Sequence, residues 1–75
     1  MDYLDSARRY RASLSDAVAQ EVMTHFITLS EDRNITMRLF HQISEMSNGI
    51  SRMRVARVLA DFRNWEYLNS PVSNG

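Results

Sequence analysis

The chain of 75 residues has no cysteine and no lysine, and it contains only two glycines and one proline. The lack of cysteine excludes disulfide frameworks, zinc knuckles, iron–sulfur clusters and thiol catalysis. Small sandwiches and barrels need turn residues every 8 to 12 positions or so, so the scarcity of glycine and proline argues against an all-β fold. No apolar run exceeds four residues, whereas a membrane-spanning helix needs about 20.

The composition predicts one globular domain. Apolar residues make up 44% of the chain and charged residues 24%, which is typical of soluble globular proteins. We expect this domain to cover residues 1–68, followed by a flexible tail at 69–75 that contains Pro71. The first residues have neither the basic region nor the apolar region of a signal peptide, so we expect a cytoplasmic protein without a membrane segment.

Charge is unevenly distributed although it sums to zero. Residues 12–47 hold two arginines against five acidic residues, a net charge of −3. Residues 48–63 hold four arginines against one aspartate, a net charge of +3. All nine basic residues are arginines, which bind phosphates and guanine edges in a bidentate manner, although a GC-rich genome would also favour arginine. The basic block is therefore a candidate binding surface.

Apolar residues recur at three- and four-residue steps in four segments, which predicts an all-α fold, a compact bundle of three to four short helices. We expect helices over 2–11, from a cap at Ser13 or Ser15 to about 29, from Ser30 to about 46, and over 52–67 after a Ser51 cap. Asn48-Gly49 should break the chain between the last two. The expected inward residues are Tyr3, Ala7, Tyr10 and Leu14; Ala17, Val18, Val22, Met23, Phe26, Ile27 and Leu29; Ile35, Leu39, Phe40, Ile43 and Met46; and Val55, Val58, Leu59, Phe62 and Trp65.

Catalytic or metal-binding residues are hard to find in this sequence. The two histidines, His25 and His41, fall on different expected helices, and no carboxylates accompany them at metal-ligand spacing. His41 and Glu45 are four residues apart, which predicts an ordinary pair on a helix face. No glycine-rich loop is present to bind phosphate. We therefore expect a protein that is not an enzyme and uses no cofactor or metal.

The segment 42–62 carries the most distinctive pattern. It combines a helix, a short turn with glycine, a capping serine and a helix with outward arginines. The stretch Gly49-Ile50-Ser51-Arg52-Met53-Arg54-Val55-Ala56-Arg57-Val58-Leu59 resembles the turn and recognition helix of lactose-repressor-type helix-turn-helix DNA-binding proteins. In that family valine and arginine stand fifth and seventh from the serine, as Val55 and Arg57 do here. The resemblance implies that Ile50, Val55 and Val58 pack inward, and that the following residues face the DNA major groove: Ser51, Arg52, Met53, Ala56 and Arg57.

The upstream half of the resemblance departs from the family pattern. Glu45 stands where the family has a small residue, and Ser44 stands where it has an apolar one. Moving the first helix back by one residue restores the pattern, with Ile43 inward and Ser44 as the small residue. That alignment requires a turn one residue longer.

Two functional hypotheses follow. The first is a sequence-specific transcription regulator of the size of phage and plasmid repressors, which would bind DNA as a homodimer, with phosphate contacts from Arg8, Arg9, Arg11 and Arg54. The second is an inhibitor or adaptor that docks on a larger regulatory protein. One convex face shared by Arg52, Arg54, Arg57 and the Arg8–Arg11 group would favour DNA. Pairing of the arginines with Asp61, Glu66 or the acidic middle of the chain would favour a protein partner. The expected dimer or partner surface comprises Tyr3, Tyr10, Trp65 and Tyr67, with dimer contacts through the first helix or through Trp65 and Tyr67.

Overall fold

The computed structural model describes residues 3–29 and 36–69, and all of its regular structure is helical. The helices are α1 (Tyr3–Ser13), α2 (Ala17–Leu29), α3 (Met37–Met46) and α4 (Arg52–Leu68). The all-α prediction is therefore confirmed. Of the expected tail at 69–75, Asn69 caps the C-terminus of α4, and residues 70–75 lie outside the described residues, as does the expected helix start at Ser30.

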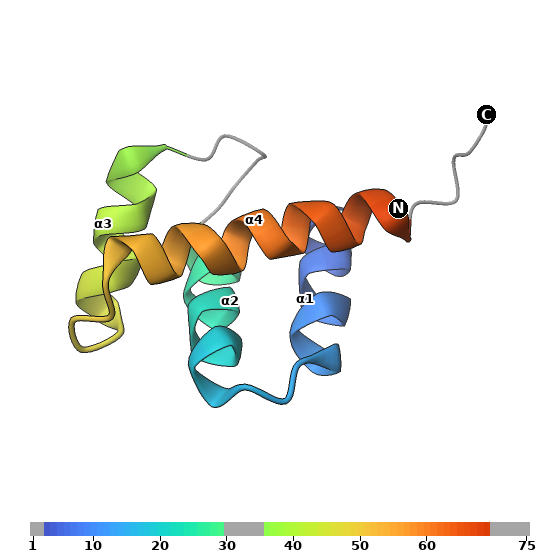
Figure 1. Cartoon of the computed structure of the whole chain (residues 1–75), viewed down its shortest axis with the longest axis horizontal. Coiled ribbons are helices and arrows are strands. Elements are labelled where there is room, and N and C mark those ends of the chain that lie inside the picture. Colours follow the sequence, from blue (N-terminus) through green and yellow to red (C-terminus); the bar gives the residue numbers. More distant parts are fainter. Residues whose placement is uncertain (1–2, 30–35, 70–75) are drawn as a thin grey trace.

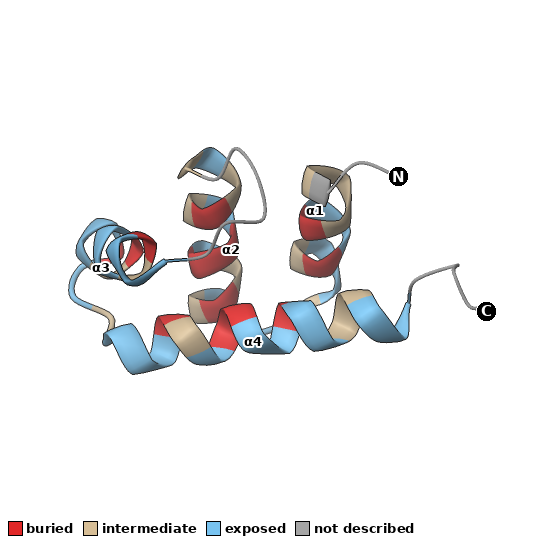
Figure 2. Ribbon diagram, turned by 90° about the horizontal axis from the view of Figure 1, so that it is seen from above, coloured by how far each residue is buried: buried red, intermediate tan, exposed pale blue. Residues whose placement is uncertain are grey.

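Three shorter helices lie side by side across the long helix α4 (Figure 1). Helix α2 lies between α1 and α3, and α4 contacts all three. The buried residues of α4 lie on the side of the helix toward the other helices, while its far side is exposed along its length (Figure 2). This arrangement leaves one full face of α4 available for a partner.

The core forms where α1, α2 and α3 meet α4. Phe62 of α4 is fully buried, and its ring contacts Tyr10 at 5.4 Å and Phe26 at 5.9 Å between ring centres. The inward residues expected for α4 are confirmed, and Trp65 packs against the core while half-buried. The buried apolar residues are Ala7, Tyr10, Ala19, Val22, Met23, Phe26, Leu39, Ile43, Val55, Val58, Leu59 and Phe62.

Two core predictions were wrong. Met46, the last residue of α3, is 44% exposed, whereas Ser47 directly after it is buried. Ala17, the first residue of α2, is also exposed, whereas Ala19, which lines a hollow together with Val58 of α4, is buried. Ile35, expected inward, lies outside the described residues.

The caps that begin the helices differ from those expected. Neither Ser13 nor Ser15 caps α2: Asp16 does, because its Oδ1 accepts a hydrogen bond from the Val18 N–H at 3.0 Å. Ser13 instead closes α1, donating its hydroxyl proton to the Tyr10 carbonyl at 2.7 Å. Helix α3 begins at Met37, later than expected, because Thr36 has an extended backbone and its Oγ1 accepts from the Leu39 N–H.

The turn between α3 and α4 covers residues 47–51. Asn48 and Gly49 both have positive φ, 57° and 82°, and the Gly49 N–H donates to the Ser44 carbonyl at 3.0 Å. Ser44 donates its hydroxyl proton to the Ile50 carbonyl, while Ile43 is fully buried. Ser51 then caps α4 by accepting the Arg54 N–H at 3.1 Å, as expected. Glycine suits the second left-handed position because it has no Cβ to strain the backbone.

Candidate nucleic-acid interface

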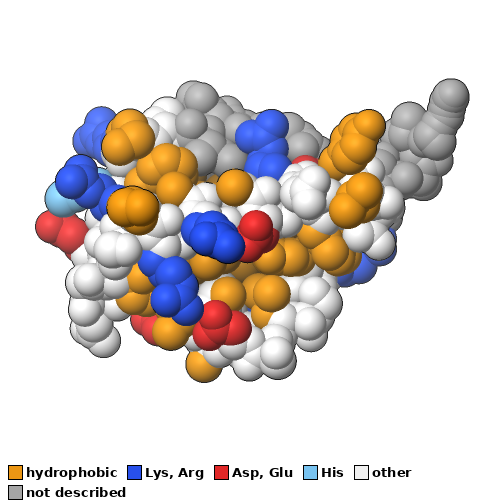
Figure 3. Space-filling model, in the orientation of Figure 1, with side chains coloured by type: hydrophobic (Ala, Val, Ile, Leu, Met, Phe, Trp, Pro, Cys, Tyr) orange, Lys and Arg blue, Asp and Glu red, His pale blue; other side chains and the backbone are white. Residues whose placement is uncertain are grey.

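The first half of α4 presents exposed arginines and a methionine on the side facing away from the core. Arg52 and Arg57 are exposed, and Met53 keeps 84% of its surface accessible. No acidic residue occurs between Ser51 and Ala60. Figure 3 views this face of α4 and shows arginines and hydrophobic side chains with acidic side chains beside them. Asp61 lines the same hollow as Arg57, and Glu45 of α3 lines a depression with Arg52 and Met53. The face therefore has the cationic and apolar groups that a DNA groove accepts.

The five expected groove residues differ in exposure: Ser51, Arg52, Met53 and Arg57 are exposed, and Ala56 is half-buried. The Ser51 hydroxyl accepts the Arg54 N–H as the expected cap of α4. Ala56 is half-buried and lines a small depression of 320 Å³ together with Phe40 and Arg63, rather than lying freely between the arginines. Arg52, Met53 and Arg57 thus remain as the residues best placed to reach a ligand.

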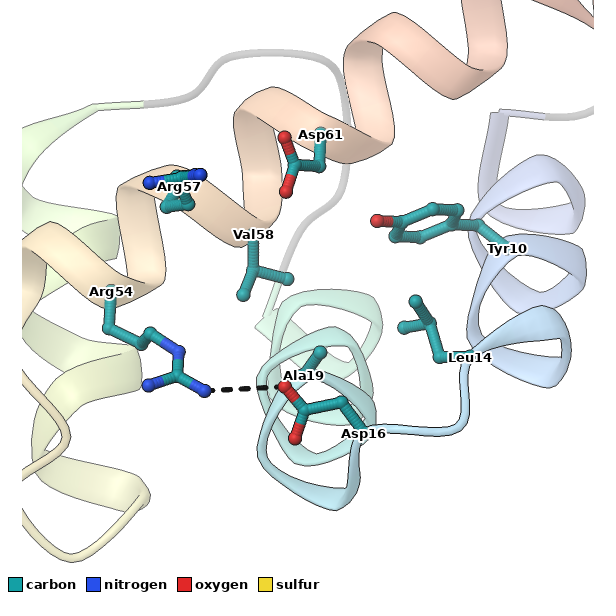
Figure 4. Close-up of a pocket in the computed structure, with 8 residues that line it drawn as sticks. All are labelled: Tyr10, Leu14, Asp16, Ala19, Arg54, Arg57, Val58 and Asp61. Atoms are coloured by element: carbon teal, nitrogen blue, oxygen red, sulfur yellow. Dashed lines mark hydrogen bonds and ion pairs between the residues drawn. The ribbon is translucent and has the colours of Figure 1, made fainter.

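The arginines of α4 differ in their partners. Arg54 donates to Asp16 at 3.2 Å, which links α4 to the start of α2 (Figure 4). Among the described residues, Arg52 and Arg57 make neither a hydrogen bond nor an ion pair through their guanidinium groups. The pairing of Arg54 with an acidic residue is the arrangement expected for a protein-binding surface, whereas Arg52 and Arg57 are exposed without such a pair among the described residues.

A hollow of 420 Å³ lies between α1, the start of α2 and α4. Its floor is apolar, and Arg54, Arg57, Asp16 and Asp61 surround its opening (Figure 4). The Tyr10 hydroxyl points into it. We call it the α1–α4 hollow, and its lining residues are Tyr10, Leu14, Asp16, Ala19, Arg54, Arg57, Val58 and Asp61.

The arginines of α1 make contacts close to that helix. Arg9 lies 3.8 Å from Asp5, and Arg11 donates to the Thr24 hydroxyl on α2 at 3.3 Å. Arg8 is exposed. Arg9 and Arg11 would therefore have to leave or share these partners in order to contact phosphate, as predicted for all three arginines.

The aromatic surface expected for a partner is only partly present. Tyr10 is buried, which corrects its assignment, because its ring packs against Phe62 and Trp65, each at 5.4 Å. Tyr67 keeps 80% of its surface exposed, and Leu68, which sequence analysis did not select, keeps 70%. The helical period could have identified Leu68, since it falls outside the inward stripe of Phe62 and Trp65. The side chain of Tyr3 is outside the described part of the chain.

The histidines form ordinary helix pairs. His41 lies 3.3 Å from Glu45, as the spacing predicted, and His25 lies 3.5 Å from Glu21. Within residues 3–29 and 36–69, no cluster of three or more potential metal ligands occurs. In the same part of the chain, no helix combines the length and apolar character needed to cross a bilayer.

Burial raises the pKa of the Tyr10 hydroxyl, and the negative charge of Asp61 raises it further. The pKa of Tyr10 is higher in the folded protein than in the unfolded chain, where it is about 10. The contribution of Tyr10 to the free energy of unfolding is therefore fully present below pH 10 or so and is lost as pH rises through the folded pKa. We expect the free energy of unfolding to fall above about pH 10 and to fall less in Tyr10→Phe. Urea titrations at several alkaline pH values would measure it. Exposed Tyr67→Phe is the control, and equal pH profiles for the parent and Tyr10→Phe would contradict the expectation.

Comparison with known proteins found no relative of this chain. No protein-family model matches the sequence, and searches of curated proteins and of solved structures found no match.

Proposed function

We propose that this protein is a small sequence-specific DNA-binding regulator of transcription, a repressor that places the first half of α4 in the major groove. The observation that carries the proposal is the exposed face of Arg52, Met53 and Arg57, which has no acidic residue between Ser51 and Ala60. Arginine makes bidentate contacts with guanine, and a methionine methyl can pack on the thymine methyl. A cytoplasmic location accords with this function.

The packing of the helices supports the same proposal. Helices α2, α3 and α4 contact one another in pairs, so the first half of α4 is held on a rigid base rather than on a loop. The Ser51 cap and the buried Val55 and Val58 determine which side of α4 faces inward. Arg52 and Arg57 are thereby directed outward, and a rigid base lowers the entropy lost on binding.

A fluorescence anisotropy titration with a mixed-sequence duplex tests the proposal. We expect binding at low salt that weakens as salt rises, with a slope of about 0.9 in log K against log salt for each neutralised phosphate. Polyglutamate serves as a control, since a surface that merely attracts anions would bind it equally well. Selection from a random duplex library should then yield a preferred sequence. Absence of binding at low salt would contradict the proposal.

The second candidate is an inhibitor or adaptor that binds a larger regulatory protein. Two observations favour it: Arg54 is paired with Asp16, and α4 ends in the exposed Tyr67 and Leu68. Aromatic and arginine side chains are the usual energetic anchors of protein interfaces. Under this function Arg57 and Tyr67 would contact the partner, and DNA titrations would show no binding.

A further inference from the structure

Three polar groups that line the α1–α4 hollow have no partner in the described part of the chain. The Tyr10 hydroxyl, the Arg57 guanidinium and the Asp61 carboxylate make neither a hydrogen bond nor an ion pair there, with each other or with other residues. The hydroxyl and the Asp61 carboxylate both point toward the middle of the hollow (Figure 4). The negative charge of Asp61 raises the pKa of Tyr10, so these two groups act on the same space. The hollow therefore offers a cation, an anion and a hydroxyl to a ligand.

The floor of the hollow is apolar and belongs to three parts of the bundle. Leu14, directly after α1, is half-buried, and Ala19 of α2 and Val58 of α4 are 7% and 5% exposed. At 420 Å³ the hollow falls within the range of small-molecule sites, about 300–1,000 Å³. Such sites combine apolar walls with a few polar groups that orient the ligand, as this hollow does.

We propose that the α1–α4 hollow binds a free α-amino acid with an aliphatic side chain. The carboxylate of the ligand pairs with Arg57, and its ammonium group pairs with Asp61. The Tyr10 hydroxyl donates a further hydrogen bond to the carboxylate. The aliphatic side chain packs on Leu14 and Val58, which removes apolar surface from water on both partners.

The charges around the opening favour a zwitterion over other ligands. Two arginines and two aspartates surround the opening, so it carries no net charge. A ligand that is only an anion would be repelled by the aspartates, and a ligand that is only a cation would be repelled by the arginines. An uncharged apolar ligand would cover Arg57 and Asp61 without pairing them, and the desolvation of an unpaired charge is costly.

The spacing of Arg57 and Asp61 suits the two charges of an α-amino acid. The two residues are four positions apart on α4, which puts their Cβ atoms about 5–6 Å apart on one surface of the helix. The ammonium and carboxylate groups of an α-amino acid are attached to the same carbon atom, so one molecule reaches both side chains. Arg54 and Asp16 already pair with each other at 3.2 Å, which leaves Arg57 and Asp61 to pair with the ligand.

NMR titration of the isotope-labelled full chain with L-leucine tests the site. We expect saturable amide shifts at the residues that line the hollow. N-acetyl-leucine lacks the ammonium charge and leucinamide lacks the carboxylate, so each should bind about tenfold more weakly. Glycine has both charges but no side chain, and it should also bind more weakly. The absence of saturable shifts up to the solubility limit of leucine, or equal binding of leucine and either blocked derivative, would overturn the proposal.

Two substitutions test the pairing of the charges. Asp61→Asn and Arg57→Gln change exposed side chains, so both variants should fold as the parent does. Each should raise the dissociation constant of leucine about tenfold, and Asp61→Asn should no longer discriminate leucine from N-acetyl-leucine. Arg63→Gln is the matched control, because Arg63 is an exposed arginine of α4 outside the hollow. Parental leucine affinity in both Asp61→Asn and Arg57→Gln would overturn the proposal.

The site also bears on DNA binding, and this step rests on the proposed function. When the guanidinium of Arg57 is paired with the ligand carboxylate it is less available to DNA, so saturating leucine should weaken DNA binding. Unchanged DNA affinity at saturating leucine would overturn this competition. Leucine binding by a protein that does not bind DNA would overturn the proposed function and leave the site intact. DNA binding by a protein that does not bind leucine would overturn the site alone.

Discussion

Replacement of Phe62 by alanine should lower the free energy of unfolding by about 3–5 kcal/mol. The Phe62 ring is fully buried and contacts the rings of Tyr10 on α1 and Phe26 on α2, so its removal leaves a cavity bordered by three helices. Stabilities of about 0.05–0.15 kcal/mol per residue imply a total of about 4–11 kcal/mol for a chain of this length. The substitution should therefore remove a large share of the stability, and urea denaturation followed by circular dichroism would measure it.

The control for this experiment is Met37→Ala. Met37 is also a large apolar residue on a helix, but it is 65% exposed, so the change should stay within about 0.5 kcal/mol. A parental unfolding curve for Phe62→Ala would contradict the observed packing of α4 on α1 and α2. Phe62→Leu should lose less of the free energy of unfolding than Phe62→Ala does, since leucine restores part of the buried volume.

Replacement of Arg57 by alanine should weaken binding to a selected DNA site by about 1–3 kcal/mol, with relaxed discrimination at one base pair. The expectation rests on the proposed function. If Arg57 contacts only phosphate, binding should instead weaken evenly across sequences and the salt slope should decrease by about one unit. Arg52→Ala should behave like Arg57→Ala, because both side chains are exposed and neither has an ion-pair partner among the described residues.

Arg54→Ala is the matched control within the same helix. Its guanidinium already binds Asp16 at 3.2 Å, and contact with DNA would require that pair to break or to be shared. We therefore expect a smaller loss of DNA affinity than for Arg57→Ala. An exposed ion pair contributes about 0–1 kcal/mol, so all three variants should fold as the parent does. If all three bound DNA with parental affinity, α4 would not be the groove-reading helix.

The helical period of the sequence was sufficient to predict which face of α4 is buried. Val55, Val58, Leu59 and Phe62 follow one another at helical spacing, and burial of apolar surface leaves such a stripe only one favourable orientation. The same stripe directs Arg52, Met53 and Arg57 outward, so the residues of the candidate interface could be selected from sequence. Asn48-Gly49 likewise predicted the end of α3, because both residues adopt the left-handed conformation that few others tolerate.

Tertiary structure decided the features that join distant segments. Tyr10 has helical spacing that predicts an inward face, but only the position of α1 beside Phe62 and Trp65 buries it and removes it from the partner surface. Asp16 and Arg54 are 38 residues apart in sequence, and no local pattern predicts their ion pair. Local sequence therefore determined helices, turns and faces, because these depend on neighbouring residues. Which arginines find an ion-pair partner and which part of α4 the other helices cover depend on how the helices pack, which no local pattern encodes.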